Sequence, residues 1–87
     1  MGKRYIRATN NRGLLCEVTP ELVAKLRTYK LLGKQEIMIQ SPCVLNQDLL
    51  ITNQLFIARS DYQQGRFKCT ATYHGNDSWL IRMWEVL

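Results

Sequence analysis

The C-terminal part of the chain alternates apolar and polar side chains. Within residues 66–73 every second position is apolar, and the positions between hold arginine, lysine or threonine. A strand with one buried face has this period of two, because successive side chains point to opposite faces of a sheet. The next four residues, His-Gly-Asn-Asp, are turn formers, and an apolar segment follows them. Residues 66–87 therefore predict a β-hairpin.

The second strand of this hairpin carries large apolar side chains on both faces, so the length of the turn decides which face is buried. A two-residue loop would bring Arg82 into the apolar face. A three-residue loop, residues 75–77, moves the pairing by one position and turns over every side chain of the second strand. We favour the three-residue loop, because burying an unpaired guanidinium costs several kcal/mol.

This register gives the hairpin a buried face and an outer face. The buried face pairs the first-strand residues Tyr73, Ala71 and Cys69 with Trp79, Ile81 and Met83. The outer face places three cations around one indole, and its members are Arg66, Lys68, Arg82 and Trp84. The competing interpretation is that Trp84 packs under the helix while the cations solvate the rim of the sheet.

The first half of the chain predicts two strands followed by a helix. Residues 3–9 and 14–18 have strand character, and the Asn-Asn-Arg-Gly between them is a reversal signal. Thr19 can cap a helix and Pro20 suits its first position. The helix is expected to run to about residue 32, with Gly33 just after its end. One stripe of this helix should face the sheet, namely Leu22, Leu26 and Tyr29.

The middle of the chain is the least regular part. Residues 36–40 predict a short strand that ends at Ser41-Pro42, because proline cannot donate to a central ladder. Residues 43–59 are apolar without a clear period, and we expect short strands at 49–52 and 55–59. A helix over residues 48–58 is the competing interpretation, although the β-branched and aromatic residues favour strand.

Together these elements predict an α+β fold with one helix packed on a mainly antiparallel sheet of about five or six strands, in the order β-β-α-β-β-β-β. A sheet of this size can also curl into a half-open barrel. The chain has 87 residues and no repeat, so we expect residues 1–87 to form a single compact domain.

The formal charge of +5 is unevenly distributed. Residues 1–34 hold eight of the twelve lysines and arginines, whereas residues 35–58 hold none. Such an asymmetry attracts polyanions or an acidic protein surface. Within the basic part, one sector of the predicted helix groups Arg27, Lys30 and Lys34.

The sequence predicts a cytoplasmic protein. Its start lacks the apolar segment of a secretory signal, and no run approaches the ~20 apolar residues of a membrane span, so we expect no membrane partner. The three cysteines, Cys16, Cys43 and Cys69, are odd in number and far apart, and we expect buried free thiols.

No motif for catalysis, metal binding or cofactor binding stands out. The cysteines and His74 lack the close Cys-x2-Cys spacing of a zinc site, and the single histidine lies in a predicted turn. The seven carboxylates are scattered and the five glycines stand singly, without a phosphate-binding pattern. We therefore expect no enzyme, no metal and no cofactor.

The sequence favours a non-catalytic binding module whose basic face engages nucleic acid or a nucleoprotein. Cations contact phosphates and aromatic rings stack on bases, and both residue types are present on the predicted outer face. The predicted binding residues are Arg66, Lys68, Arg82 and Trp84, with Arg27, Lys30 and Lys34 on the helix.

The alternative is a small inhibitor or adaptor that docks on a larger protein, of the kind that phages and mobile elements encode. Tryptophan, methionine and arginine are enriched at protein–protein interfaces, and a basic surface would favour an acidic partner. The C-terminal strand could also pair edge to edge in a homodimer.

Overall fold

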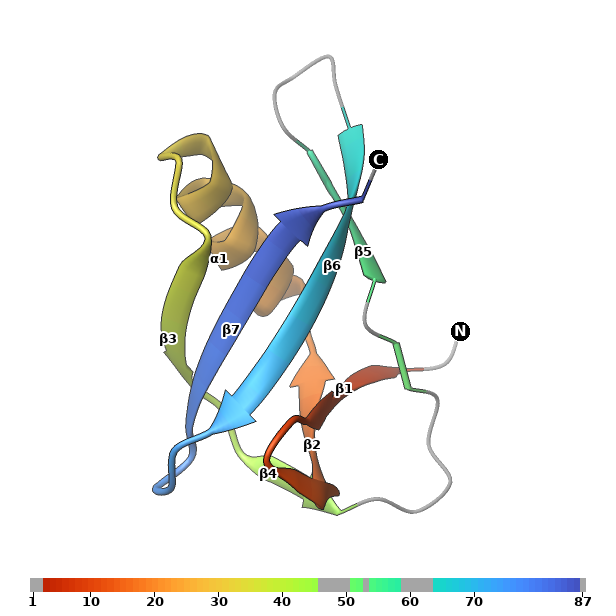
Figure 1. Cartoon of the computed structure of the whole chain (residues 1–87), viewed down its shortest axis with the longest axis vertical. Helices are drawn as coiled ribbons and strands as arrows, with labels where there is room; N and C mark the ends of the chain where they lie inside the picture. The colour runs from red at the N-terminus through yellow and green to blue at the C-terminus, as the bar shows by residue number, and fades with distance from the viewer. Residues whose placement is uncertain (1–2, 46–50, 53, 59–63, 87) are drawn as a thin grey trace.

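The computed structural model describes residues 3–45, 51–52, 54–58 and 64–86. It has one helix and a curled sheet, so the predicted α+β fold is confirmed (Figure 1). The helix is α1 (Pro20–Leu31). The strands are β1 (Arg4–Ala8), β2 (Asn11–Val18), β3 (Glu36–Gln40), β4 (Cys43–Leu45), β5 (Gln54–Ala58), β6 (Gln64–Tyr73) and β7 (Ser78–Glu85).

Helix α1 begins and ends as its sequence predicts. The Thr19 hydroxyl accepts a hydrogen bond of 3.1 Å from the Leu22 N–H, which satisfies one of the unpaired donors of the first turn. Gly33 has a φ of 77°, and its N–H donates to the Lys30 carbonyl at 3.0 Å. The predicted stripe packs on the sheet, with Leu22 and Leu26 buried and Tyr29 against the core.

The strand order is β3-β7-β6-β1-β2-β4, and β5 also pairs with β6. The long strand β6 explains this branching. Its first part pairs with β5, whereas its second part meets β1 in parallel at a single pair, Ala8 and Ala71. Strands β1 and β5 both pair with the edge of β6 opposite β7, but they run in different directions. The sheet therefore curls into a half-open barrel (Figure 1).

The β6–β7 hairpin has the predicted register, which keeps Arg82 out of the buried face. Tyr73 pairs with Trp79 and Thr70 pairs with Arg82. The loop has three residues, Gly75, Asn76 and Asp77, whose φ angles are 83°, 53° and 58°. Glycine adopts positive φ without strain, and asparagine and aspartate tolerate it better than other residues do.

The middle of the chain contains one strand that was predicted and one that was not. Residues 54–58 form strand β5, which confirms the favoured strand there, and the competing helix is wrong over these residues. A strand at Cys43–Leu45 was not predicted. Strand β4 forms because it pairs with β2, a contact that local periodicity does not report. Of the predicted strand at 49–52, residues 49–50 lie outside the described residues, and Ile51 makes a single parallel bridge to Tyr5.

Strand β7 lies inside the sheet, between β3 and β6. A homodimer through an exposed edge of the C-terminal strand is therefore not supported, because β3 already pairs with it from Ser78 to Arg82. The sequence could not reveal this pairing, since nearly 40 residues separate the two strands. At this end of the sheet, the outermost strand is β3 (Figure 1).

The core lies between α1 and the concave face of the sheet. Trp79, Phe67, Ile81 and Leu26 have no exposed surface. The Trp79 indole N–H donates to the Ser41 carbonyl at 2.8 Å, so its polar atom is satisfied inside the protein. Trp79 is thus a core residue.

Candidate binding face

The face of strands β3, β7 and β6 that points away from α1 is called the outer face. The register places its residues in cross-strand rows: Glu36 beside Arg82 and Thr70, Met38 beside Leu80 and Thr72, and Lys68 beside Trp84. The alternation that buries the inner residues sends these side chains to the opposite side. Four of the predicted binding residues share this face, namely Arg66, Lys68, Arg82 and Trp84.

Trp84 is a surface residue. Its side chain is 40% exposed, so the interpretation that it packs beneath the helix is wrong. Lys68 is its cross-strand partner, and the Lys68 ammonium lies 5.9 Å from the centroid of a ring of the indole. A cation at this distance is attracted to the ring quadrupole, by about 0.5–1 kcal/mol at an exposed site.

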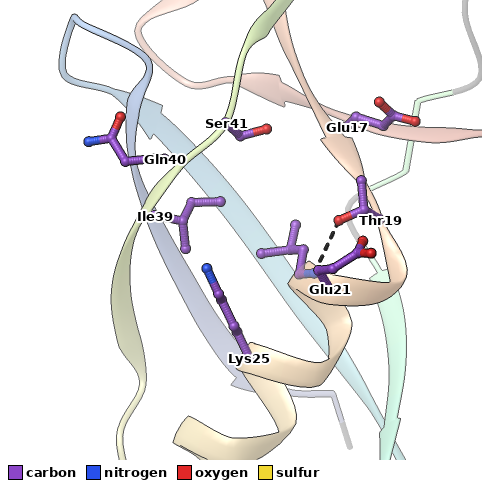
Figure 2. A pocket seen from close by; sticks show the side chains of 8 residues that line it. Glu17, Thr19, Glu21, Lys25, Ile39, Gln40 and Ser41 are labelled. Carbon is purple, nitrogen blue, oxygen red and sulfur yellow. Dashed lines mark hydrogen bonds between the residues drawn. The ribbon is translucent and has the colours of Figure 1, made fainter.

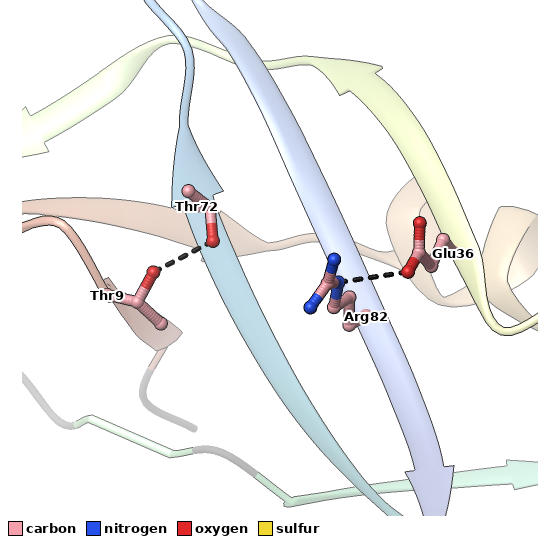
Figure 3. A network of polar contacts seen from close by, with 4 residues as sticks. All are labelled: Thr9, Glu36, Thr72 and Arg82. Atoms are coloured by element: carbon pink, nitrogen blue, oxygen red, sulfur yellow. Dashed lines mark hydrogen bonds and ion pairs between the residues drawn. The ribbon is translucent and has the colours of Figure 1, made fainter.

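Arg82 points outward and is ion-paired. Its Nε lies 3.0 Å from Oε1 of Glu36 on the adjacent strand (Figure 3). Both side chains are more than half exposed, and pairs of this kind contribute only about 0–1 kcal/mol. The contact holds the guanidinium over the outer face, but it also offsets part of the positive charge there.

Polar contacts link the outer face to the β1–β2 turn. The hydroxyls of Thr9 and Thr72 are 2.8 Å apart (Figure 3). The Asn10 side chain accepts from the Tyr73 N–H at 3.0 Å and donates to the Tyr73 carbonyl at 2.7 Å. These bonds hold the β1–β2 turn against the end of β6 and so fix the position of the outer face relative to β1.

The three predicted helix residues belong to a different part of the surface. Arg27, Lys30 and Lys34 are carried by α1 or the turn after it, on the other side of the sheet (Figure 1). The Lys30 ammonium lies 5.1 Å from the ring centroid of the buried Phe67, and that of Lys34 lies 5.5 Å from the ring of Tyr29. These two lysines contact the helix–sheet core region, so the predicted set divides into two groups.

Two apolar residues of the outer face, Met38 and Leu80, do not belong to the predicted binding set. Met38 is 55% exposed, and its partner in β7 is the half-buried Leu80. In Glu-Ile-Met-Ile-Gln the alternation puts Met38 on the opposite face from its two isoleucine neighbours, so its exposure could have been predicted from the sequence. Its place beside β7, however, depends on a pairing between distant segments.

A larger hollow borders the outer face where β1 and β6 diverge. It has a volume of about 520 Å³, and it is lined by Ile6, Arg7, Thr9, Ile51, Thr52, Cys69 and Thr70. Thr70 belongs to the outer face, and Arg7 is exposed. The hollow therefore adds the Arg7 cation and the hydroxyls of Thr9 and Thr52 beside the outer face.

A smaller pocket lies at the start of α1 (Figure 2). Its lining residues are Glu17, Thr19, Glu21, Leu22, Lys25, Ile39, Gln40 and Ser41, and its volume is about 70 Å³. Ligand sites usually occupy ~300–1,000 Å³, whereas one water takes ~30 Å³. The Thr19 hydroxyl is also committed to capping the helix. This pocket has room for a few waters and not for a substrate.

The cysteines lie in the interior or close to it. Cys16 and Cys43 are cross-strand partners in β2 and β4. Burial raises the pKa of the Cys16 thiol to about 11 and that of the Cys69 thiol to about 12, because a thiolate is poorly solvated there. Within the described residues, no three histidine, cysteine, aspartate or glutamate side chains gather as they would around a metal ion.

Comparison with protein families, with curated proteins and with solved structures finds no match for this chain. None of the helical residues that the structure describes form a segment long and apolar enough to cross a membrane.

Proposed function

We propose that this chain is a non-catalytic binding module whose outer face engages single-stranded nucleic acid, alone or within a nucleoprotein complex. The observation that carries the proposal is the exposed indole of Trp84 among Arg66, Lys68 and Arg82, on the sheet face that points away from α1. A stacked base contributes about 1–3 kcal/mol, and each cation can contact a phosphate.

The geometry favours a single strand over a duplex. A broad sheet face does not fit into the major groove, which admits a helix or a two-stranded ribbon. Bases inside a duplex are already stacked on one another, so the indole of Trp84 could reach only an unpaired base. The hollow beside the face, with Arg7, Thr9 and Thr70, is a second place for an unpaired base or a phosphate.

Binding of fluorescently labelled single-stranded oligonucleotides tests the proposal. With three phosphate contacts, the affinity should fall about 20-fold between about 50 and 200 mM salt. Trp84→Ala should weaken binding by about 5-fold to 150-fold, the equivalent of one stacked base. Lys68→Gln should reduce both the affinity and the salt slope.

Lys34→Gln is the matched control, because it removes the same charge from the other side of the sheet. It should leave the affinity within about 2-fold of the wild-type value. The proposal is wrong if no single-stranded probe binds at low salt, or if Lys34→Gln weakens binding as much as Lys68→Gln does.

A second candidate function is docking on a partner protein as an inhibitor or adaptor. It is favoured by the exposed Met38 beside Leu80 and by the Glu36–Arg82 ion pair, which makes the face less cationic than its arginines and lysines alone suggest. Affinity purification from host cells, with and without nuclease, separates the two functions. A partner that survives nuclease treatment and is lost with Met38→Asp favours protein docking.

A further inference from the structure

Strand β3 has an outer edge, and no described strand lies beyond it. The strand order ends at β3, and all five of its residues pair with β7 on one side only (Figure 1). An exposed edge is a template for pairing with another chain, and proteins usually guard such edges with charged side chains, proline or a bulge. Strand β3, Glu-Ile-Met-Ile-Gln, contains no proline and its register with β7 is continuous, and its one charged side chain, Glu36, is ion-paired with Arg82 of β7.

The hydrogen bonds to β7 show which backbone groups point to this edge. The Met83 N–H donates to the Gln35 carbonyl, and the Ser41 N–H donates to the Asp77 carbonyl, each at 2.9 Å. In an antiparallel ladder every second residue bonds to the same neighbour. Residues 35, 37, 39 and 41 therefore face β7, and the N–H and C=O groups of Glu36, Met38 and Gln40 point outward.

We propose that two copies of this chain pair antiparallel through their β3 edges, around a two-fold axis at Met38. In this register Met38 faces Met38 of the second copy, and Glu36 faces Gln40 of the second copy. These are the residues whose backbone groups point outward, so each facing pair can exchange two N–H···O bonds. If the register shifted by one residue, the outward backbone groups of one copy would face residues of the other copy whose backbone groups point to their own β7. These hydrogen bonds would then be lost.

The side chains are compatible with the same axis. Glu36 would lie opposite a neutral glutamine, so no like charges face each other directly. Ile37 would lie opposite Ile39 of the second copy on the inner face, and the two Met38 side chains would meet on the outer face. Met38, which is 55% exposed in one copy, gains an apolar neighbour. An isologous contact of this kind closes at two copies.

Pairing would join the two sheets into one and place both outer faces on the same side. The pairing involves only the edge of β3 and requires no ligand on the outer face. It also differs from a dimer through the C-terminal strand, since β7 lies inside the sheet.

Sedimentation velocity over a range of concentrations in about 150 mM salt tests the pairing. One copy has a mass of 10.2 kDa, and we expect a species of twice that mass to become populated as concentration rises. Met38→Pro removes an N–H that points to the outer edge and leaves the bonds to β7 in place. It should abolish the dimer, whereas Met38→Leu should keep it.

A cross-linking variant keeps the proposal falsifiable if Met38→Pro does not fold. Met38→Cys should be linked rapidly into a dimer by a short bismaleimide, whereas Arg12→Cys, exposed in β2, should not. A mass of 10.2 kDa at every concentration, or equal cross-linking of both variants, would overturn the proposal. Dimerisation that persists in a folded Met38→Pro variant would overturn it as well.

Discussion

At the residue scale, the two tryptophans illustrate how burial assigns different roles to one side chain. Trp79 and Trp84 lie five positions apart on β7, and this odd spacing places them on opposite faces. Trp79 has no exposed surface and its N–H is bonded to Ser41, whereas Trp84 is 40% exposed. The first stabilises the fold, and the second is available to a ligand.

Alanine substitutions should separate these roles. Trp79→Ala should lower the free energy of unfolding by about 3–5 kcal/mol, because it empties part of the core and leaves the Ser41 carbonyl without its donor. Trp84→Ala should change the free energy of unfolding by no more than about 1 kcal/mol. Urea denaturation measures both values. Equal losses would mean that Trp84 is a structural residue.

The buried thiols predict a loss of stability at alkaline pH. The folded state raises the pKa of Cys69 from 9.0 to about 12, so above pH 9 the unfolded chain releases this proton first. The contribution of the protonated Cys69 thiol to the free energy of unfolding is complete below pH 9 and declines as the pH rises toward 12. Cys69→Ala removes this contribution, so its free energy of unfolding should fall less than that of the wild type between pH 9 and 11. Urea denaturation at a series of pH values measures the free energy of unfolding of both proteins. An equal decline in the two proteins with rising pH would contradict this expectation.

At the scale of single elements, the local signals were sufficient for α1 and for the turn of the β6–β7 hairpin. Thr19, Pro20 and Gly33 define both ends of the helix through contacts within a few residues. The three-residue loop follows from a similar local argument, since the alternative buries Arg82. Signals of this kind are readable from sequence because the interacting groups are close along the chain.

Removal of the helix cap should have a measurable cost. Thr19→Ala deletes the acceptor of the Leu22 N–H and should lower the free energy of unfolding by about 0.5–2 kcal/mol. The control is Thr28→Ala on the exposed side of the same helix, where the Thr28 hydroxyl only bonds back to the Ala24 carbonyl. It should be neutral or slightly stabilising, because alanine has the higher helix propensity. Thermal unfolding compares the two variants, and equal losses of stability would contradict the capping role of Thr19.

At the scale of the whole molecule, the curl of the sheet depends on a close contact between β1 and β6. Ala8 and Ala71 face each other there, both almost fully buried, and the Thr9 N–H donates to the Ala71 carbonyl at 2.8 Å. Small side chains are needed where the two strands meet. The contact sets the position of β1 relative to the outer face and the adjoining hollow.

Overfilling this contact should destabilise the protein. Ala71→Leu adds bulk at a position with no exposed surface and should cost about 1–3 kcal/mol in the free energy of unfolding. Thr70→Leu, one residue earlier on the outer face, should cost less because its side chain can extend into solvent. Thermal denaturation compares the two. An Ala71→Leu variant as stable as the wild type would show that the contact has room to spare.

Local patterns in the chain were enough to predict the fold class, the ends of α1, and the face of the hairpin that holds Arg66, Lys68, Arg82 and Trp84. These features depend on strand period, helix capping and the cost of burying a charge, which act over short stretches of chain. Three features follow from the folded arrangement alone: β3 lies beside β7, Glu36 pairs with Arg82, and the helix lysines are separated from the outer face. Strand pairing joins backbone groups that are far apart along the chain, and alternation within one strand does not identify its neighbour.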